Sequence, residues 1–167
     1  MKNIRIYYGS STGMTQEIAD RIADKLGLTK DCIKDVSNLT KEDAEKADVL
    51  LLGSSTWGSG DLQDDWYSGI DTLKTANLGG KVIALFGCGD SQSFGDTFCG
   101  ALGNIYNALK DSGAAFVGFM PTEEYDYSDS EAVVDGKFVG LALDEANEPE
   151  KTDERIDKWI SELKLHL

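Results

Sequence analysis

The sequence predicts an α/β protein of the doubly wound class, in which a five-stranded parallel sheet carries helices on both faces. Short β-rich runs alternate with amphipathic helical runs along the chain, and this alternation implies parallel strands. Two of the runs, V-L-L-L-G from Val49 and K-V-I-A-L-F-G from Lys81, are continuously apolar, as expected for strands covered on both faces. With 167 residues and 41% hydrophobic content, the chain has the size of one domain, and we expect residues 1–167 to form it.

The first half of the chain supplies the first cycles of this alternation. Thr15–Leu26 is predicted to be a helix because Ile18, Ile22 and Leu26 recur at helical spacing and Gly27 follows as a stop. The other elements expected in this half are the strands Ile4–Tyr8, Cys32–Val36 and Val49–Gly53 and the helices Lys41–Lys46 and Asp64–Lys74.

The second half repeats the cycle. Its last helix has an apolar side, because Ile156, Trp159, Ile160 and Leu163 fall on one face, and we expect Trp66 and Trp159 to lie in or beside the core. The elements expected in this half are the strands Lys81–Gly87 and Ala115–Phe119 and the helices Ala101–Ser112 and Thr152–Leu165.

One stretch interrupts the rhythm. Residues 121–144 begin with an acidic run and continue through Asp135-Gly136, a strong signal for a hairpin turn. We interpret about 121–137 as an insertion near the fifth strand, with Phe138–Leu143 resuming the sheet.

Composition limits the class of partner. Thirty acidic against sixteen basic residues give a net charge of -14, which repels nucleic acid and anionic membrane surfaces. The charge favours a basic protein partner, although it also suits a protein that is merely kept soluble. No apolar run approaches the roughly 20 residues of a membrane span, and the first residues lack the apolar stretch of a signal peptide, so we expect a cytoplasmic protein.

The cysteine pattern does not predict a disulfide framework. Cys32, Cys88 and Cys99 make no C-x-x-C pair and no even set, which argues against disulfides and against a zinc site. We expect buried thiols in a reducing compartment.

Three loops contain the residues suited to ligand binding. They follow the first, third and fourth strands, and ligands of open parallel sheets bind beyond the carboxyl ends of strands, where the strand order reverses. All three are rich in Gly, Ser, Thr and Asp: G-S-S-T-G-M-T from Gly9, S-S-T-W-G-S-G-D from Ser54, and G-C-G-D-S-Q-S-F-G-D from Gly87.

The first loop has two readings. G-S-S-T-G fits the G-x-S-x-G nucleophile elbow, but Ser11 would need a histidine base, and His166 lies one residue from the end of the sequence. The second reading uses the hydroxyls of Ser10, Ser11, Thr12 and Thr15, which surround Gly13 at a helix N-terminus that favours an anion. The loop holds no Lys or Arg, so a phosphate there would be neutralised by hydrogen bonds, unless the loop is only a helix cap.

The other two loops each contribute an aromatic residue. Trp57 stands beside glycines, where an indole can stack on a planar ring or can simply cover the core, and Phe94 offers a second face. Two aromatic rings around a flat heterocycle, with a phosphate cradle alongside, describe a pocket for flavin mononucleotide (FMN).

These motifs together resemble the long-chain flavodoxins, and the resemblance runs from Ile4 to the final helix. It rests on S-S-T-G-M-T, S-T-W-G-S-G-D-L-Q-D-D-W, F-G-C-G-D with Phe94, and F-V-G-L-A-L-D-E. It implies a flavodoxin-like sheet in the order 2-1-3-4-5. It also implies a monomeric, low-potential, one-electron carrier with non-covalent FMN that cycles between neutral semiquinone and anionic hydroquinone and turns over no substrate of its own.

The resemblance also assigns residues. It implies that 10–15 bind phosphate, that Trp57 and Phe94 cover the ring, that 87–90 bond the pyrimidine edge, and that a peptide flip at Gly58 tunes flavin N5. The full set of expected FMN contacts is Ser10, Ser11, Thr12, Gly13, Met14, Thr15, Ser55, Thr56, Trp57, Gly58, Ser59, Gly60, Gly87, Cys88, Gly89, Asp90, Phe94 and Cys99.

Three positions depart from the family pattern. Met14 replaces an asparagine that can brace the loop, Phe94 replaces a tyrosine, and Ala146 stands where related chains often have an aspartate. We expect a modest loss of FMN affinity from the first change and a less tethered ribityl end from the last.

The implied partners are basic-surfaced redox proteins, such as an NADPH-dependent flavodoxin reductase and low-potential acceptor enzymes. Two other classes are weighed against this reading. A response-regulator receiver needs an acidic pair after strand one and an aspartate after strand three, where this chain has Tyr8-Gly9-Ser10 and Ser54-Ser55-Thr56. An FMN-dependent quinone or azo reductase needs space over one ring face, which Trp57 and Phe94 are expected to cover.

Overall fold

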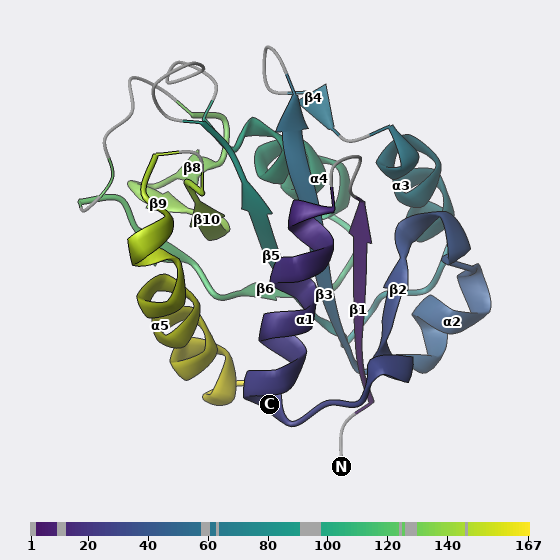
Figure 1. Cartoon of the computed structure of the whole chain (residues 1–167). Helices are drawn as coiled ribbons and strands as arrows, with labels where there is room; N and C mark the ends of the chain where they lie inside the picture. Colours follow the sequence, from purple (N-terminus) through teal and green to yellow (C-terminus); the bar gives the residue numbers. More distant parts are fainter. Residues whose placement is uncertain are drawn as a thin grey trace.

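The computed structural model describes residues 3–9, 13–57, 61–62, 64–90, 98–123, 125, 130–145 and 147–167. Its main sheet has the strand order β10-β5-β3-β1-β2, with parallel pairing between each pair of neighbours (Figure 1). A further strand, β6, pairs in parallel with β5 beside β10. The bounds of these strands are β1 Ile4–Gly9, β2 Ile33–Asp35, β3 Val49–Trp57, β5 Val82–Cys88, β6 Ala115–Val117 and β10 Gly140–Leu143. The predicted order 2-1-3-4-5 is confirmed, and its fifth strand consists of two pieces.

Helices cover both faces of this sheet, as predicted. α1 (Met14–Leu26) and α5 (Thr152–Lys164) contact each other on one face, while α3 (Asp65–Thr75) and α4 (Gly100–Leu109) contact each other on the opposite face (Figure 1). The short helix α2 (Lys41–Lys46) packs beside α3. Each of these helices lies within three residues of the bounds that the sequence predicts. Short 3-10 turns occupy Lys30–Cys32, Val36–Asn38 and Pro149–Lys151.

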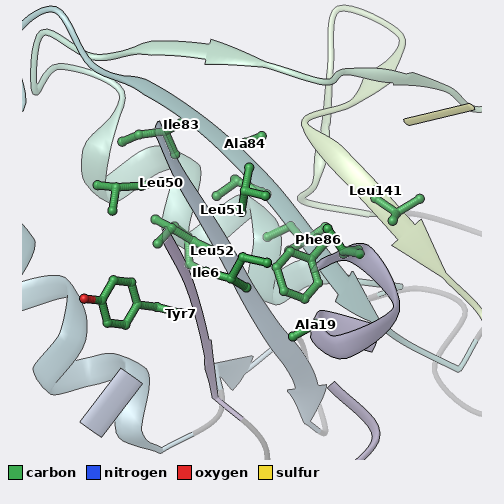
Figure 2. Packing of buried hydrophobic residues seen from close by; sticks show 14 of the residues in the cluster. Ile6, Tyr7, Ala19, Leu50, Leu51, Leu52, Ile83, Ala84, Phe86 and Leu141 are labelled. Carbon is green, nitrogen blue, oxygen red and sulfur yellow. The ribbon is translucent and has the colours of Figure 1, made fainter. Parts of the chain in front are cut away.

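The core consists of the apolar runs that the sequence singles out. Leu50, Leu51 and Leu52 of β3 are all fully buried, which confirms that this strand is covered on both faces (Figure 2). Trp66 and Trp159 are also fully buried, as expected. The indole N–H of Trp66 donates a hydrogen bond of 2.6 Å to the carbonyl of Gly53, which fixes α3 against β3.

The strands on either side of the predicted insertion are shorter than predicted. The strand at Ala115 ends at Val117 rather than Phe119, and the main sheet resumes at Gly140 rather than Phe138. Val117 pairs with Ala84 and Gly140 pairs with Leu85, so the chain leaves the main sheet after residue 117 and returns to it at residue 140, one position further along β5.

A small antiparallel sheet occupies this excursion and explains the difference. It has the order β7-β9-β8, built from Met120–Pro121, Lys137–Phe138 and Val133–Val134. The hairpin turn predicted at Asp135-Gly136 is present, with φ of 53° and 79° at these residues. The turn directs Phe138 back onto both Met120 and Val133, so this residue belongs to the small sheet.

The cysteine prediction holds for two of the three thiols. Cys88 and Cys99 are buried, whereas Cys32 is only half-buried at the end of a 3-10 turn, and all three are free. Within the described ranges, no helix combines the length and the apolar character needed to cross a bilayer.

Candidate functional site at the carboxyl edge of the sheet

The register of the sheet brings the predicted loops to one edge. Gly9 at the end of β1 pairs with Ser54, Ser54 pairs with Gly87, and Gly87 pairs with Ala142 of β10. In Figure 1 the arrowheads of β1, β3 and β5 accordingly point to the same edge. The three loops therefore leave the sheet from neighbouring positions, as a ligand site at the switch point between strands requires.

The N-terminus of α1 lies at this edge and lacks a side-chain cap among the described residues. Gly13 precedes the helix in the left-handed conformation, with φ of 89°, and its carbonyl accepts the N–H of Glu17 at 3.0 Å. The N–H groups of the first helical turn have no acceptor within a helix, so this end favours an anion. Of the predicted phosphate residues, Ser10, Ser11 and Thr12 lie outside the described residues.

Thr15 gives the strongest sign of a ligand at this helix end. Its side chain is fully buried, and its hydroxyl oxygen has no hydrogen-bond partner in the described part of the chain. A buried hydroxyl without a partner costs about 1–3 kcal/mol, so a polar ligand that bonds to it would recover that cost. Met14 beside it is 41% exposed, so its side chain does not close the helix end.

The end of β3 differs from the prediction. Residues 54–57 were expected to form an irregular loop, but they continue the strand, because Thr56 and Trp57 pair with Leu62 and Asp61 of the short antiparallel strand β4 (Asp61–Leu62). Gly58, Ser59 and Gly60, which are predicted to bind the flavin, lie outside the described residues. For Trp57 the structure describes the backbone only.

Two hydroxyls of β3 have different surroundings. The Ser55 hydroxyl is buried and, like that of Thr15, has no partner among the described residues. The Thr56 hydroxyl instead accepts a 3.2 Å hydrogen bond from the backbone N–H of Ala101 in the first turn of α4. Thr56 thus ties α4 to the end of β3, while Ser55 supplies a second hydroxyl suited to a polar ligand.

The third loop is fixed where it leaves β5. The N–H of Gly89 donates a 2.9 Å hydrogen bond to the carbonyl of Leu143, and the Cys99 thiol donates to the same carbonyl at 3.8 Å. Gly89 approaches α4 so closely that a Cβ atom there would lie 2.8 Å from the backbone nitrogen of Cys99. Phe94, the predicted second stacking residue, lies outside the described residues.

Neither thiol near this loop is an activated nucleophile. Burial raises the pKa of Cys88 to about 12 and the pKa of Cys99 well above its ordinary value. Both thiols therefore stay protonated at neutral pH.

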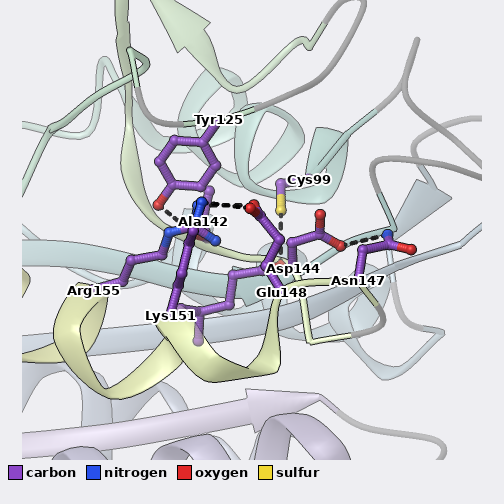
Figure 3. Close-up of polar contacts among 9 residues, drawn as sticks. Cys99, Tyr125, Ala142, Asp144, Asn147, Glu148, Lys151 and Arg155 are labelled. Atoms are coloured by element: carbon purple, nitrogen blue, oxygen red, sulfur yellow. Dashed lines mark hydrogen bonds and ion pairs between the residues drawn. The ribbon is translucent and has the colours of Figure 1, made fainter.

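Asp90 has a partner that the sequence did not reveal. The side-chain amide nitrogen of Asn147 donates a 2.8 Å hydrogen bond to Asp90 and another of 2.8 Å to Asp144, which follows β10 directly. The bond between Asp144 and Asn147 is visible in Figure 3. The predicted pyrimidine-edge loop is thus attached to the segment after β10. Ala146, one of the departures from the family pattern, lies outside the described residues.

Arg155 supports the same region from the α5 side, and sequence analysis missed it too. It is almost completely buried, donates a 3.0 Å hydrogen bond to Glu148, and lies over the ring of Tyr125 (Figure 3). The Tyr125 hydroxyl in turn donates to the carbonyl of Ala142 in β10 at 2.6 Å. A signal was present, since Arg155 stands four residues before Trp159 on the apolar side of α5. In the ranges that the structure describes, no group of acidic, histidine or cysteine side chains could hold a metal ion.

The sheet is doubly wound, and the buried hydroxyls of Thr15 and Ser55 at its switch point have no partner among the described residues. These features define a class of proteins that bind a ligand beyond the carboxyl ends of their strands. Comparison with known proteins specifies the family. The chain matches the family model named Flavodoxin over residues 6–159. It is 46% identical to flavodoxin 1 of Azotobacter vinelandii, over 98% of this chain and 96% of the relative, and 42% identical to a Klebsiella pneumoniae flavodoxin, over 100% and 97%.

A solved structure agrees with the sequence relatives. The flavodoxin of Fusobacterium nucleatum, crystallised bound to flavin mononucleotide, superposes with a TM-score of 0.91 at 37% identity, over 100% of this chain and 99% of that one. The chain belongs to the flavodoxin family.

Proposed function

We propose that the chain binds FMN non-covalently at the carboxyl edge of its sheet and carries single electrons between redox proteins, without turnover of a substrate of its own. The observation that carries the proposal is the hydroxyl of Thr15, which is buried in the first turn of α1 and has no hydrogen-bond partner among the described residues. Family membership and the FMN-bound relative support the same assignment.

The residues of the site fit FMN. The phosphate of FMN accepts hydrogen bonds, and both the start of α1 and the Thr15 hydroxyl can donate them. The Ser55 hydroxyl is a further buried donor one strand away, at the end of β3. The approach of Gly89 to Cys99 leaves no room for a side chain at position 89, so backbone is presented there, which suits contact with a ring edge.

FMN supplies the one-electron chemistry when it is bound, and the protein positions it and adjusts its potential. The carboxylates of Asp90 and Asp144 are held together by Asn147 at the loop expected to meet the ring edge. Their negative charge opposes the addition of an electron nearby, so these residues favour a low potential.

The proposal extends to the domain, the oligomeric state, the partners and the location of the protein. We propose a monomeric protein of one FMN-binding domain, residues 1–167, whose partners are basic-surfaced redox proteins such as an NADPH-dependent flavodoxin reductase and low-potential acceptor enzymes. The net charge of -14 supports electrostatic steering toward such partners. The free state of all three thiols supports a cytoplasmic location.

Titration of the apoprotein with FMN and with riboflavin tests the proposal. We expect stoichiometric uptake of FMN with quenching of its fluorescence, and much weaker binding of riboflavin, because riboflavin lacks the phosphate that the start of α1 would hold. An apoprotein that binds neither compound, or binds both equally, contradicts the proposed cradle.

A second measurement separates a carrier from the quinone or azo reductase considered above. After reconstitution with FMN, mixing with NAD(P)H alone should reduce the flavin negligibly, and addition of a flavodoxin reductase should accelerate reduction. Rapid reduction by NAD(P)H without a reductase would identify an enzyme instead.

A further inference from the structure

We infer that Asn147 is a positioning residue for the flavin site: its amide holds the Asp90 carboxylate, and with it residues 89 and 90 directly after β5, in the position that receives the ring edge. This inference rests on the proposed function. It concerns a residue outside the loops singled out in the sequence.

The first step is the chemistry of the bridge. An ionised carboxylate only accepts hydrogen bonds, whereas a side-chain amide nitrogen carries two N–H groups. The nitrogen of Asn147 lies 2.8 Å from Oδ1 of Asp90 and 2.8 Å from Oδ1 of Asp144, so each N–H serves one carboxylate. The two acceptor oxygens are therefore no more than about 5.6 Å apart, since each is bonded to the same nitrogen.

The second step is that Asn147 is itself held in place. The carbonyl of Asp144 accepts the N–H of Asn147 at 3.2 Å and the N–H of Glu148 at 2.7 Å, which closes a turn at the end of β10. Glu148 is further fixed by hydrogen bonds from Lys151 and from the buried Arg155 (Figure 3). The amide thus projects from a rigid turn and is suited to locate a neighbouring loop.

The third step is that this support acts on the first two residues after β5. The N–H of Gly89 already bonds to Leu143 of β10, and Asn147 adds the contact one residue later, at Asp90. Without the amide, the Asp90 and Asp144 carboxylates would lose the donor that they share, and the repulsion between their negative charges would increase. The repulsion would displace the more exposed partner, Asp90, because Asp144 is almost completely buried.

The test compares Asn147→Ala with wild type and with Asn107→Ala, the same change on an exposed position of α4. We expect the Kd of the N147A apoprotein for FMN to rise about tenfold, while Asn107→Ala stays at the wild-type value. We also expect the midpoint potential of the bound flavin to become more negative in N147A, because the charge of Asp90 loses the partial compensation that the Asn147 amide gives it. A role confined to folding would lower apoprotein stability and leave the potential unchanged.

The outcomes are separable. Uptake of FMN by the wild-type apoprotein establishes the proposed function independently of Asn147. If the wild type binds FMN and N147A binds it with a Kd within about threefold, or keeps the wild-type potential, the inference is overturned. Should the N147A apoprotein fail to fold, Asn147→Leu, which nearly keeps the size of the side chain and removes the donor without adding a charge, is read by the same two measurements.

Discussion

The guanidinium carbon of Arg155, on α5, lies 3.9 Å from the ring centroid of Tyr125, in the excursion between β6 and β10. The same guanidinium donates a hydrogen bond to Glu148, and the Tyr125 hydroxyl donates to β10. One buried charge thus joins the last helix, the excursion and the edge of the main sheet.

Arg155→Ala is expected to lower the free energy of unfolding by about 3 kcal/mol, because it removes a buried ion-pair partner and a stacked cation together. Urea denaturation of the apoprotein measures the loss. Lys158→Ala is the matched control on the same helix, since the pair of Lys158 with Glu154 is exposed and should contribute about 0.5 kcal/mol or less. Equal effects of the two substitutions would mean that the burial of Arg155 adds nothing.

Thr15→Val is expected to separate ligand binding from stability. Valine keeps the shape of the side chain and removes a buried hydroxyl that has no partner in the described ranges, so the apoprotein should be as stable as wild type or more stable by about 1 kcal/mol. The FMN affinity should fall at least about tenfold because a hydrogen bond to a charged group is lost. The control is Thr15→Ser, which retains the hydroxyl. Weaker FMN binding in the serine variant than in the valine variant would be incompatible with this role.

Stability should depend on pH through Glu148. Hydrogen bonds from Lys151 and then Arg155 lower the pKa of this carboxyl below its ordinary value of 4.5. The ionised form is favoured in the folded state, so its contribution is present above the unfolded pKa and is lost as pH falls through the folded one. The stability difference between wild type and Glu148→Gln should therefore be constant near neutral pH and shrink in acid. A difference that stays the same throughout an acid titration would contradict the assignment.

Alkylation of the thiols should be selective. Because burial raises the pKa of Cys88 to about 12 and also raises the pKa of Cys99, iodoacetamide at about pH 8 should modify only Cys32 in the folded apoprotein. The number of labels, measured by mass spectrometry, should rise to three in denaturant. Rapid labelling of Cys99 without denaturant would show that the loop after β5 opens.

Much of the fold could be predicted because local patterns and tertiary structure agree. The run at Leu50–Leu52 is apolar at every position, and a strand buried on both faces requires this. Alternation of strands and helices then places the ends of β1, β3 and β5 at one edge, so the predicted loops come together whatever their detailed conformation.

The misses have a common physical cause, which is that each contact depends on its partner residues as well as on the pattern of the segment itself. The polar residues 54–57 look like a loop, yet they form a strand because β4 pairs with them. Phe138 fits the apolar run that follows it, but the hairpin turn pairs it with Val133 instead. The roles of Asn147 and Arg155 depend on neighbours at positions 90 and 125, and no local pattern brings those positions near.

The register at the edge of the sheet suggests how a shorter chain could keep the same architecture. Val117 and Gly140 pair with successive residues of β5. A direct peptide bond between them would therefore join β6 and β10 into one continuous strand and keep the pairing register with β5. Deletion of residues 118–139 would also remove Tyr125 and Phe138, which pack on Phe98. The Arg155 guanidinium would then lose the Tyr125 ring on which it stacks. A compact version of this protein therefore needs new side chains at Phe98 and Arg155 rather than a new backbone.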